Sequence, residues 1–180
     1  MNTYKIGDIM FKYLKDLKQF IKLNDPSFKG NFEFLLYPGV KAVIYYHISR
    51  FFYLRKFYYI SRRIMEHAKR KTGIEIHPGA VIGKNLFIDH GFGVVIGETC
   101  VIGDNVVIFQ GVTLGSTLKE NTFKRHPNIG SNVIIGSGAK VLGNITIGSN
   151  VKIGANSVVI DNIESNSTVV GIKAKVVKKN

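Results

Sequence analysis

The 180-residue sequence predicts a mainly β protein, a parallel β-helix of hexapeptide repeats preceded by a short α-helical segment. Two periodicities predict this fold. In the first part of the chain, apolar residues recur close to every 3.6 positions, which indicates amphipathic helices. From Gly73 onward, aliphatic residues recur every six positions and are commonly followed by glycine, as in "IGKN", "IGET" and "IGDN". A short fixed period is typical of a solenoid, and three such hexads make one triangular coil of about 18 residues.

Residues 1–72 form the predicted helical region. Its first helix is indicated by the apolar pattern of "MFKYLKDLKQFIKL". Asp25 followed by Pro26 is expected to cap a second helix, because proline is tolerated at the first helical position. After a break at "YPG" (37–39), residues 40–70 are expected to be helical and rich in Tyr, Phe, Arg and Lys. Such a helix could bind a membrane or RNA, but we expect its aromatic residues to be packed core.

Residues 73–172 form the predicted β-helix domain, and residues 173–180 form a basic tail. Each hexad is expected to supply one short strand and one turn. Its aliphatic side chain points inward and stacks on its counterpart one coil away. Small residues allow the tight corners. The inward residues fall into three series that are each in phase, Ile76 to Val94, Ile96 to Leu114 and Ile129 to Val159.

Two interruptions break the six-residue phase. The first is a slip of two residues at Asp89-His90, inside "FIDHGFGVVIGET". The second lies between Leu114 and Ile129, which are fifteen positions apart where twelve would keep phase. Residues 115–128 are therefore expected to leave the coil as a polar, basic loop. Binding and catalytic residues concentrate on loops held by rigid scaffolds, so both interruptions are candidate parts of a functional site.

The composition indicates a cytoplasmic protein. The net charge of +13, from 25 Lys and Arg against 12 Asp and Glu, favours nucleic acid, a membrane surface or a phosphorylated cofactor as partner. A lysine-rich background composition explains the charge equally well. The single cysteine, Cys100, excludes an intrachain disulfide framework and fits a reducing compartment. No signal-peptide core is present, and no segment approaches the roughly 20 apolar residues of a membrane-spanning helix. We expect no membrane insertion.

The motifs "IEIHP", "DHG", "GET" and "RHP", in this order, resemble those of the serine O-acetyltransferases. The resemblance covers roughly residues 25–172, and the ordered set is more specific than the hexads, which many acyltransferases share. It implies a left-handed β-helix and transfer of an acetyl group from acetyl-CoA to L-serine, giving O-acetylserine for cysteine biosynthesis. It also implies a homotrimer or a hexamer, with each active site lined by two chains.

By this resemblance, His90 is the general base and Glu75 is its acidic partner. A serine hydroxyl is a poor nucleophile near neutral pH, and a neutral imidazole is suited to removing its proton. Glu75, which stands where the family has Asp, would hold the imidazole in one tautomer and stabilise its charged form. The two residues are about one coil apart. The alternative is a histidine that makes a corner hydrogen bond and a solvated glutamate.

The resemblance also implies separate partners for the two charged groups of serine. Asp25 and Asp89 match acidic residues that bind the amino group, and Asp25 has the helix-cap interpretation as well. Arg125 and His126, in the predicted loop, match residues that receive the carboxylate. A guanidinium can donate two hydrogen bonds to one carboxylate. An exposed basic loop is the alternative interpretation of "KRH".

Acetyl-CoA is expected to lie along the wall of the β-helix, and no metal is expected. The matching positions are Ser116 and Thr117 on the loop and Ser137 and Ala155 on later coils, while Lys152 could meet a phosphate. One departure affects this part of the site. The family's "GGTG" is replaced by "GSTL" (115–118), which leaves the geometry of the acyl donor open.

Three other functions are compatible with parts of the sequence. An acetyltransferase of a sugar or xenobiotic hydroxyl would share His90 and coenzyme A but would not need Asp89 together with Arg125 and His126. A carbonic anhydrase on the same scaffold needs three histidines that converge on one zinc, and the five histidines show no close pair of the needed kind. A non-catalytic protein could bind partners through the basic helix. The complete chemical set favours the serine enzyme.

The carboxy-terminal sequence "VVGIKAKVVKKN" bears on a protein partner. Many serine acetyltransferases insert a terminal isoleucine into the active site of O-acetylserine sulfhydrylase. Asn180 is polar, so its burial in that pocket would gain little apolar contact and would risk an unpaired amide. We therefore expect no tight complex with the sulfhydrylase, and no nucleic-acid partner.

Overall fold

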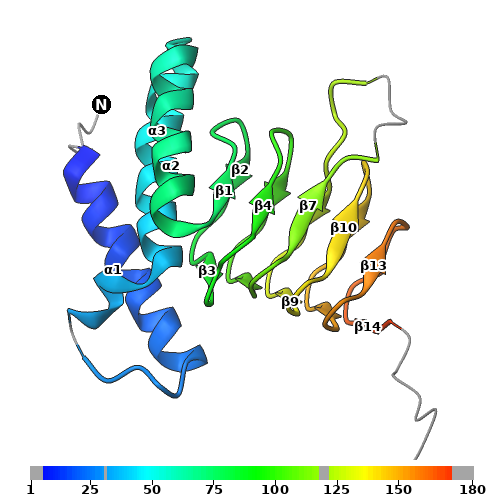
Figure 1. Ribbon diagram of the computed structural model, residues 1–180. Helices are drawn as coiled ribbons and strands as arrows, with labels where there is room; N and C mark the ends of the chain where they lie inside the picture. Colours follow the sequence, from blue (N-terminus) through cyan, green and yellow to red (C-terminus); the bar gives the residue numbers. More distant parts are fainter. Residues whose placement is uncertain (1–5, 31, 118–121, 172–180) are drawn as a thin grey trace, which may run out of the picture.

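The computed structural model describes residues 6–30, 32–117 and 122–171, and the predicted tail at 173–180 lies outside these ranges. Three α-helices lie at one end of the molecule, and a stack of β coils extends away from them (Figure 1). The helical elements are α1 (Ile6–Asn24), the 3-10 helix η1 (Glu33–Leu36), α2 (Pro38–Leu54) and α3 (Tyr58–Thr72).

The strands of the described residues are two or three residues long and form three parallel sheets. Sheet A contains β1 (Glu75–Ile76), β4 (Val95–Ile96), β7 (Thr113–Gly115), β10 (Lys140–Leu142) and β13 (Val158–Val159). Sheet B contains β11 (Thr146–Ile147), β8 (Asn128–Ile129), β5 (Val101–Ile102) and β2 (Val81–Ile82). Sheet C contains β14 (Thr168–Val169), β12 (Lys152–Ile153), β9 (Ile134–Ile135), β6 (Val107–Ile108) and β3 (Phe87–Ile88). From β1 to β13 the chain visits A, B and C in turn, which confirms the predicted parallel β-helix.

The inward aliphatic residues form the core of the coil. On sheet A, Ile76 is in register with Ile96, and Ile96 with Leu114, and all three side chains are buried. Parallel strands lie about 4.8 Å apart, so each inward side chain stacks on its counterpart in the next coil. This stacking confirms the six-residue pattern as the signal that places residues inside.

The strand register shows the size of both interruptions. The coil between Lys140 and its register partner Val158 has the regular length and serves as the reference. Glu75 pairs with Val95, so the first coil is longer than the regular one by the two residues of the predicted slip. Val101 pairs with Asn128, so the coil that contains the loop is longer by nine. The expectation that twelve positions between Leu114 and Ile129 would keep phase was wrong. These residues lie on β7 and β8, which are consecutive strands, so only one hexad step would separate them without the loop.

The helices close one end of the coil and cover part of its outer surface. Ala42, Val43 and Tyr46 of α2 belong to the same buried cluster as the first coil. Leu17 and Ile21 of α1 are fully buried in a second cluster, which includes outward residues of sheet C. The aromatic residues of the helical region are divided between these clusters and the surface: Tyr46 is buried, whereas Tyr59 is 74% exposed.

Two expectations for the helical region were wrong. Residues 40–70 form two helices, because the chain turns between Leu54 and Tyr58, where Lys56 adopts a left-handed backbone conformation (φ 65°). Asp25 caps no helix, since α1 ends at Asn24 and the next helical element begins at Glu33. None of the described helices is long and apolar enough to cross a membrane.

Candidate active site

The turns of the coil place the predicted site residues on two different edges of the prism. We call the turns from sheet C to sheet A the C–A edge, and the turns from sheet A to sheet B the A–B edge. Asp89 and His90 follow β3 and lie on the C–A edge. Arg125 and His126 precede β8 and lie on the A–B edge. Sheet A separates the two pairs within one chain.

The two-residue slip is a tight turn that exposes His90. His90 has a φ of 56°, and Gly91 and Gly93 also have positive φ. Gly91 is buried, and a side chain on it would collide with Ile74. A turn with three residues in left-handed conformations bends the chain sharply in little space. It directs the imidazole of His90 to solvent and leaves Asp89 half-buried beside it.

Asp25 lies close enough to His90 for the two to interact electrostatically. One carboxylate oxygen of Asp25 accepts hydrogen bonds from the backbone N–H and hydroxyl of Ser27 (2.8 and 2.6 Å), and the other accepts one from the Tyr37 hydroxyl (2.6 Å). The bonds from Ser27 and Tyr37 lower the pKa of Asp25, and positive charge on His90 contributes in the same direction. Asp25 is therefore an ionised group near the imidazole.

Glu75, the predicted partner of His90, is paired with a different residue. Its Oε2 lies 2.5 Å from the Nζ of Lys69, in the last turn of α3. The hydrogen bond from Lys69 to this carboxylate raises the lysine pKa. The hydrogen bonds and ion pairs of the described residues include none between Glu75 and His90.

On the A–B edge, His126 is buried and held in one orientation by Thr99. The backbone N–H of Thr99 donates to Nδ1 of His126 (3.2 Å), and the Thr99 hydroxyl lies 2.9 Å from the same nitrogen. Because Nδ1 accepts the backbone hydrogen, the proton of the neutral ring is on Nε2. Burial lowers the pKa of His126, which favours this neutral form. Gly97 leaves room for the ring, since a side chain there would collide with Cδ2 and Nε2 of His126.

Arg125 is oriented by Glu98. Its Nη2 donates to Oε2 of Glu98 at 2.8 Å, and its backbone N–H donates to the Thr99 hydroxyl at 3.1 Å. The motif "GET" (97–99) therefore gives room, a counter-charge and a hydroxyl to the loop residues Arg125 and His126. Neither Glu98 nor Thr99 was among the predicted site residues. The signal that could have indicated these two residues is the position of "GET" on the A–B edge, one coil before the loop leaves the same edge.

The comparisons with known proteins give the family. The family model described as bacterial transferase hexapeptide (six repeats) matches residues 126–161. The serine acetyltransferase of Staphylococcus xylosus is 55% identical over 175 residues, which cover 95% of this chain and 81% of that enzyme. The chain belongs to the serine acetyltransferase family. The enzyme of Bacillus subtilis (strain 168) is 51% identical over 173 residues, covering 96% of this chain and 79% of the relative.

Solved structures of serine acetyltransferases share the fold. The Neisseria gonorrhoeae enzyme in complex with serine has a TM-score of 0.83 and 37% identity, covering 92% of this chain and 69% of that one. Isoform 3 from Entamoeba histolytica, in complex with cysteine, has a TM-score of 0.83 and 41% identity. This chain is covered to 94% in that match and spans 63% of the length of the Entamoeba chain.

The positions expected to bind acetyl-CoA in this serine acetyltransferase family member lie on both edges. Ser137 and Ala155 follow β9 and β12 on the C–A edge, the edge that carries His90. Neighbouring coils are about 4.8 Å apart, so Ser137 is about 10 Å and Ala155 about 15 Å along the edge from His90. Ser116 and Thr117 follow β7 on the A–B edge and are half-buried, whereas Lys152 begins β12 with its side chain exposed.

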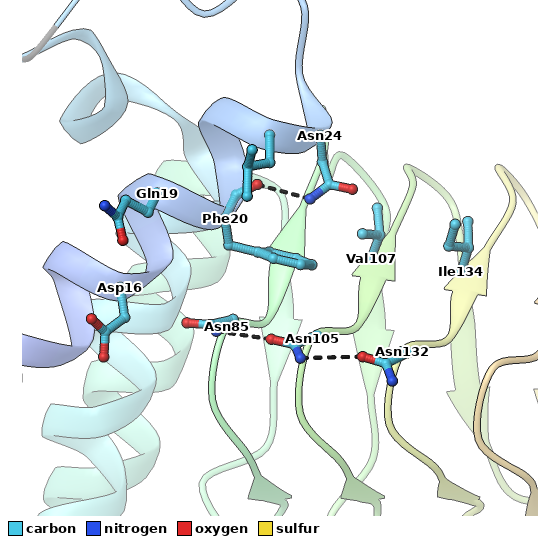
Figure 2. A pocket seen from close by; sticks show the side chains of 10 residues that line it. Asp16, Gln19, Phe20, Asn24, Asn85, Asn105, Val107, Asn132 and Ile134 are labelled. Carbon is cyan, nitrogen blue, oxygen red and sulfur yellow. Dashed lines mark hydrogen bonds between the residues drawn. The ribbon is translucent and has the colours of Figure 1, made fainter.

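A separate groove of about 500 Å³ lies between α1 and the turns from sheet B to sheet C (Figure 2). Its floor carries a ladder in which Asn85 donates to Asn105 (2.8 Å) and Asn105 donates to Asn132 (3.1 Å). All three asparagines have a φ of 58°, a conformation that asparagine tolerates. None of the predicted site residues lines this groove. In the described part of the chain, no group of three or more His, Cys, Asp or Glu side chains is placed to hold a metal ion.

Proposed function

We propose that this chain transfers the acetyl group of acetyl-CoA to the hydroxyl of L-serine. The observation that carries the proposal is the 55% identity to a serine acetyltransferase over 95% of the chain. The site residues support it chemically. Carboxylates at Asp25 and Asp89 suit an ammonium group, and the pair Arg125 and His126 suits a carboxylate. A sugar acceptor carries neither charged group and needs neither set.

In the proposed reaction, neutral His90 accepts the proton of the serine hydroxyl as its oxygen attacks the thioester carbonyl. The carbon–oxygen bond forms, the carbon–sulfur bond breaks, and the imidazolium returns its proton to the departing thiolate. Glu75 stabilises the imidazolium by its negative charge. The exposure of His90 on a tight turn supports the role, because the imidazole is accessible to a substrate.

We also propose that the complete site lies between two chains of a homotrimer. The ammonium and the carboxylate of serine leave the same carbon atom. Their proposed partners lie on different edges of one chain, with sheet A between them. If the C–A edge of one chain faced the A–B edge of a neighbour, the proposed partners of the ammonium and of the carboxylate would lie in one site. Repeating this contact around a threefold axis closes a ring with three equivalent sites.

For acetyl-CoA, we propose binding along the same intermolecular cleft. Ser137 and Ala155 would contact it from the C–A edge, and Ser116 and Thr117 from the neighbour's A–B edge. Lys152 would meet a phosphate, because its ammonium is exposed at the start of β12. Ser137 and Ala155, on two successive coils of the C–A edge, support this placement, since their small side chains leave the backbone accessible to an extended ligand.

Mass spectrometry of the product from L-serine and acetyl-CoA tests the function. We expect a product heavier than serine by one acetyl group, attached through the hydroxyl oxygen, with release of one thiol per product. A panel of sugar and xenobiotic hydroxyl compounds serves as the comparison. Efficient acetylation of a panel member, with serine left unmodified, would reject the proposed acceptor while retaining the fold and the base.

A further inference from the structure

A pocket lined mainly by lysines lies between α1 and the segment that follows this helix. We call it the lysine pocket, and its volume is about 400 Å³. Four ammonium groups surround it, and the remaining lining residues are uncharged. The lining residues are Lys15, Lys18, Gln19, Lys22, Phe28, Lys29 and Gly30. Such a concentration of one charge in one small concave space calls for a ligand of the opposite charge.

Three of the four lysines are placed by the period of α1. Lys15, Lys18 and Lys22 lie on one face of the helix, because residues three or four positions apart are neighbours on a helix surface. Lys29 approaches the same pocket from the segment after the helix. Like charges at these helical spacings destabilise a helix. A bound anion would offset this repulsion.

The protein itself supplies little negative charge to these lysines. The ion pairs between described residues include none formed by Lys15, Lys22 or Lys29. Asp16 follows Lys15 in the sequence, but its side chain lines the separate groove with the asparagine ladder (Figure 2). The side chains of Lys15, Lys22 and Lys29 are exposed, so their ammonium groups are accessible to a ligand from solution.

One carboxylate does reach the segment that lines the pocket. Oε2 of Glu33 accepts hydrogen bonds from the backbone N–H groups of Lys29 and Gly30, at 3.0 and 3.1 Å. Two successive N–H groups directed at one anionic oxygen are typical of a backbone site for anions. A single carboxylate beside four ammonium groups leaves an excess of positive charge in the lysine pocket.

The chemistry of the lining residues suits phosphate groups. Lysine binds phosphate as a compact point charge, whereas paired hydrogen bonds to a planar carboxylate are characteristic of arginine. Among the described residues, those that line the pocket include four lysines and no arginine. The volume is within the range of small-molecule sites. Several phosphates on one small molecule could each approach a different ammonium group.

We propose that the lysine pocket binds a small ligand that carries several phosphate groups. The inference is independent of the proposed function, because it uses none of the residues proposed to bind serine or acetyl-CoA. The two sites also lie in different directions from His90. Ser137 and Ala155 are on later coils of the β-helix, whereas the lysine pocket belongs to the helical end.

Isothermal titration calorimetry of the full chain with inorganic tripolyphosphate tests the site. We expect a single ligand per chain. Binding should weaken about tenfold or more when sodium chloride is raised from about 50 to about 300 mM, because salt screens exposed charges. Saturating coenzyme A should leave the affinity for tripolyphosphate unchanged, since the proposed cleft for acetyl-CoA is elsewhere.

A triple variant removes the exposed charges of the pocket. Combined Lys15→Gln, Lys22→Gln and Lys29→Gln should weaken tripolyphosphate binding about tenfold or more, because three favourable charge interactions are lost. Lys18 is retained, since its Nζ lies 5.9 Å from the centre of the Phe34 ring. The melting temperature should be unchanged or higher, because repulsion along α1 is reduced.

Two further variants give the expected effect a matched control and a sign. Combined Arg63→Gln, Arg70→Gln and Lys71→Gln removes the same number of exposed positive charges from α3 and should change the affinity less than about twofold. Glu33→Gln should strengthen binding about two- to fivefold, because it removes the carboxylate charge beside the pocket. The amide oxygen of glutamine can still accept from the same backbone N–H groups.

Several outcomes would overturn the proposal. Equal weakening by both triple variants would show that tripolyphosphate responds only to the overall charge of the protein. Displacement of tripolyphosphate by coenzyme A would place its site in the proposed acetyl-CoA cleft. Failure of the unmodified protein to bind tripolyphosphate would reject a small phosphorylated ligand. Binding of single-stranded RNA or phosphatidylglycerol vesicles in that case would assign the lysines to a macromolecular surface.

Discussion

Lys69 and Glu75 form an ion pair in which Nζ and Oε2 are 2.5 Å apart. It connects the last turn of α3 to the first strand of the β-helix. Gly73 allows this close return, because it ends α3 in a left-handed conformation (φ 70°). The pair gives Glu75, the proposed partner of the catalytic base, a cation from its own chain. Lys69 and the imidazolium of His90 would therefore compete for one carboxylate during the reaction.

Lys69→Met should alter the pH dependence of the enzyme. Removal of the ammonium leaves the negative charge of Glu75 free to stabilise the imidazolium of His90. The acid limb of the kcat/KM profile, which reports the essential base, should therefore move to higher pH. Arg62→Met, which breaks an exposed ion pair in the same helix, should leave the limb in place. An unchanged limb in Lys69→Met would show that the pair has no influence on the base.

His90→Asn should abolish most turnover without loss of stability. Asparagine is chosen because residue 90 has a φ of 56°, which asparagine tolerates better than alanine. General-base catalysis contributes about 10²–10⁴-fold, so kcat should fall within this range. The melting temperature, followed by circular dichroism, should stay within a few degrees. A variant with half of the original activity would show that His90 is not the base.

Mixed trimers test whether the site is shared between chains. His90→Asn and Arg125→Ala chains should each be nearly inactive alone. When they are co-expressed with different tags and assemble at random, one site in four would combine an intact C–A edge with an intact A–B edge. The mixture should recover about a quarter of the original activity, because the edges of each site come from neighbouring copies. Absence of recovery in mixed assemblies isolated through both tags would place the whole site within one chain.

Stability should decrease as the pH falls from about 7 to about 5. Burial lowers the pKa of His47, His77 and His126 in the folded protein. The unfolded chain, with histidines titrating near 6.5, then binds more protons than the folded chain at acidic pH. The stabilisation is complete above the unfolded value and is lost as the pH falls through the folded values. Urea unfolding at a series of pH values measures this slope.

His47→Phe gives this prediction a specific control. Among the described residues, Nε2 of His47 is buried without a hydrogen-bond partner, and the ring packs against Tyr13 and Tyr46 with centres 4.8 and 5.1 Å away. Phenylalanine keeps these contacts and removes the group that must be protonated on unfolding. The variant should match the original stability at pH 7.5 and should show a shallower loss towards pH 5. An equal slope in both proteins would contradict the role of His47.

The long-range contacts explain which site residues the sequence could not reveal. Arg125 and His126 were predicted from a motif, but the partners that orient them, Glu98 and Thr99, lie on the preceding coil, on the far side of the loop in the sequence. Such contacts depend on how many residues the loop inserts between two coils. Asp25 was predicted as a helix cap, whereas its carboxylate binds Ser27 and Tyr37 in a turn after α1. Local signals for a cap and for such a turn are nearly the same.

The amino-acid sequence by itself determined the coil, because an inward aliphatic residue at every sixth position is a local property that each coil repeats. It also located both interruptions, at His90 and between Leu114 and Ile129. Only the tertiary structure decided which side chains meet. The insertions lengthen two coils relative to the regular one, and this register brings α2 and the loop together at Glu98. Contacts between coils follow from that register, and the register cannot be deduced from any short segment of the sequence.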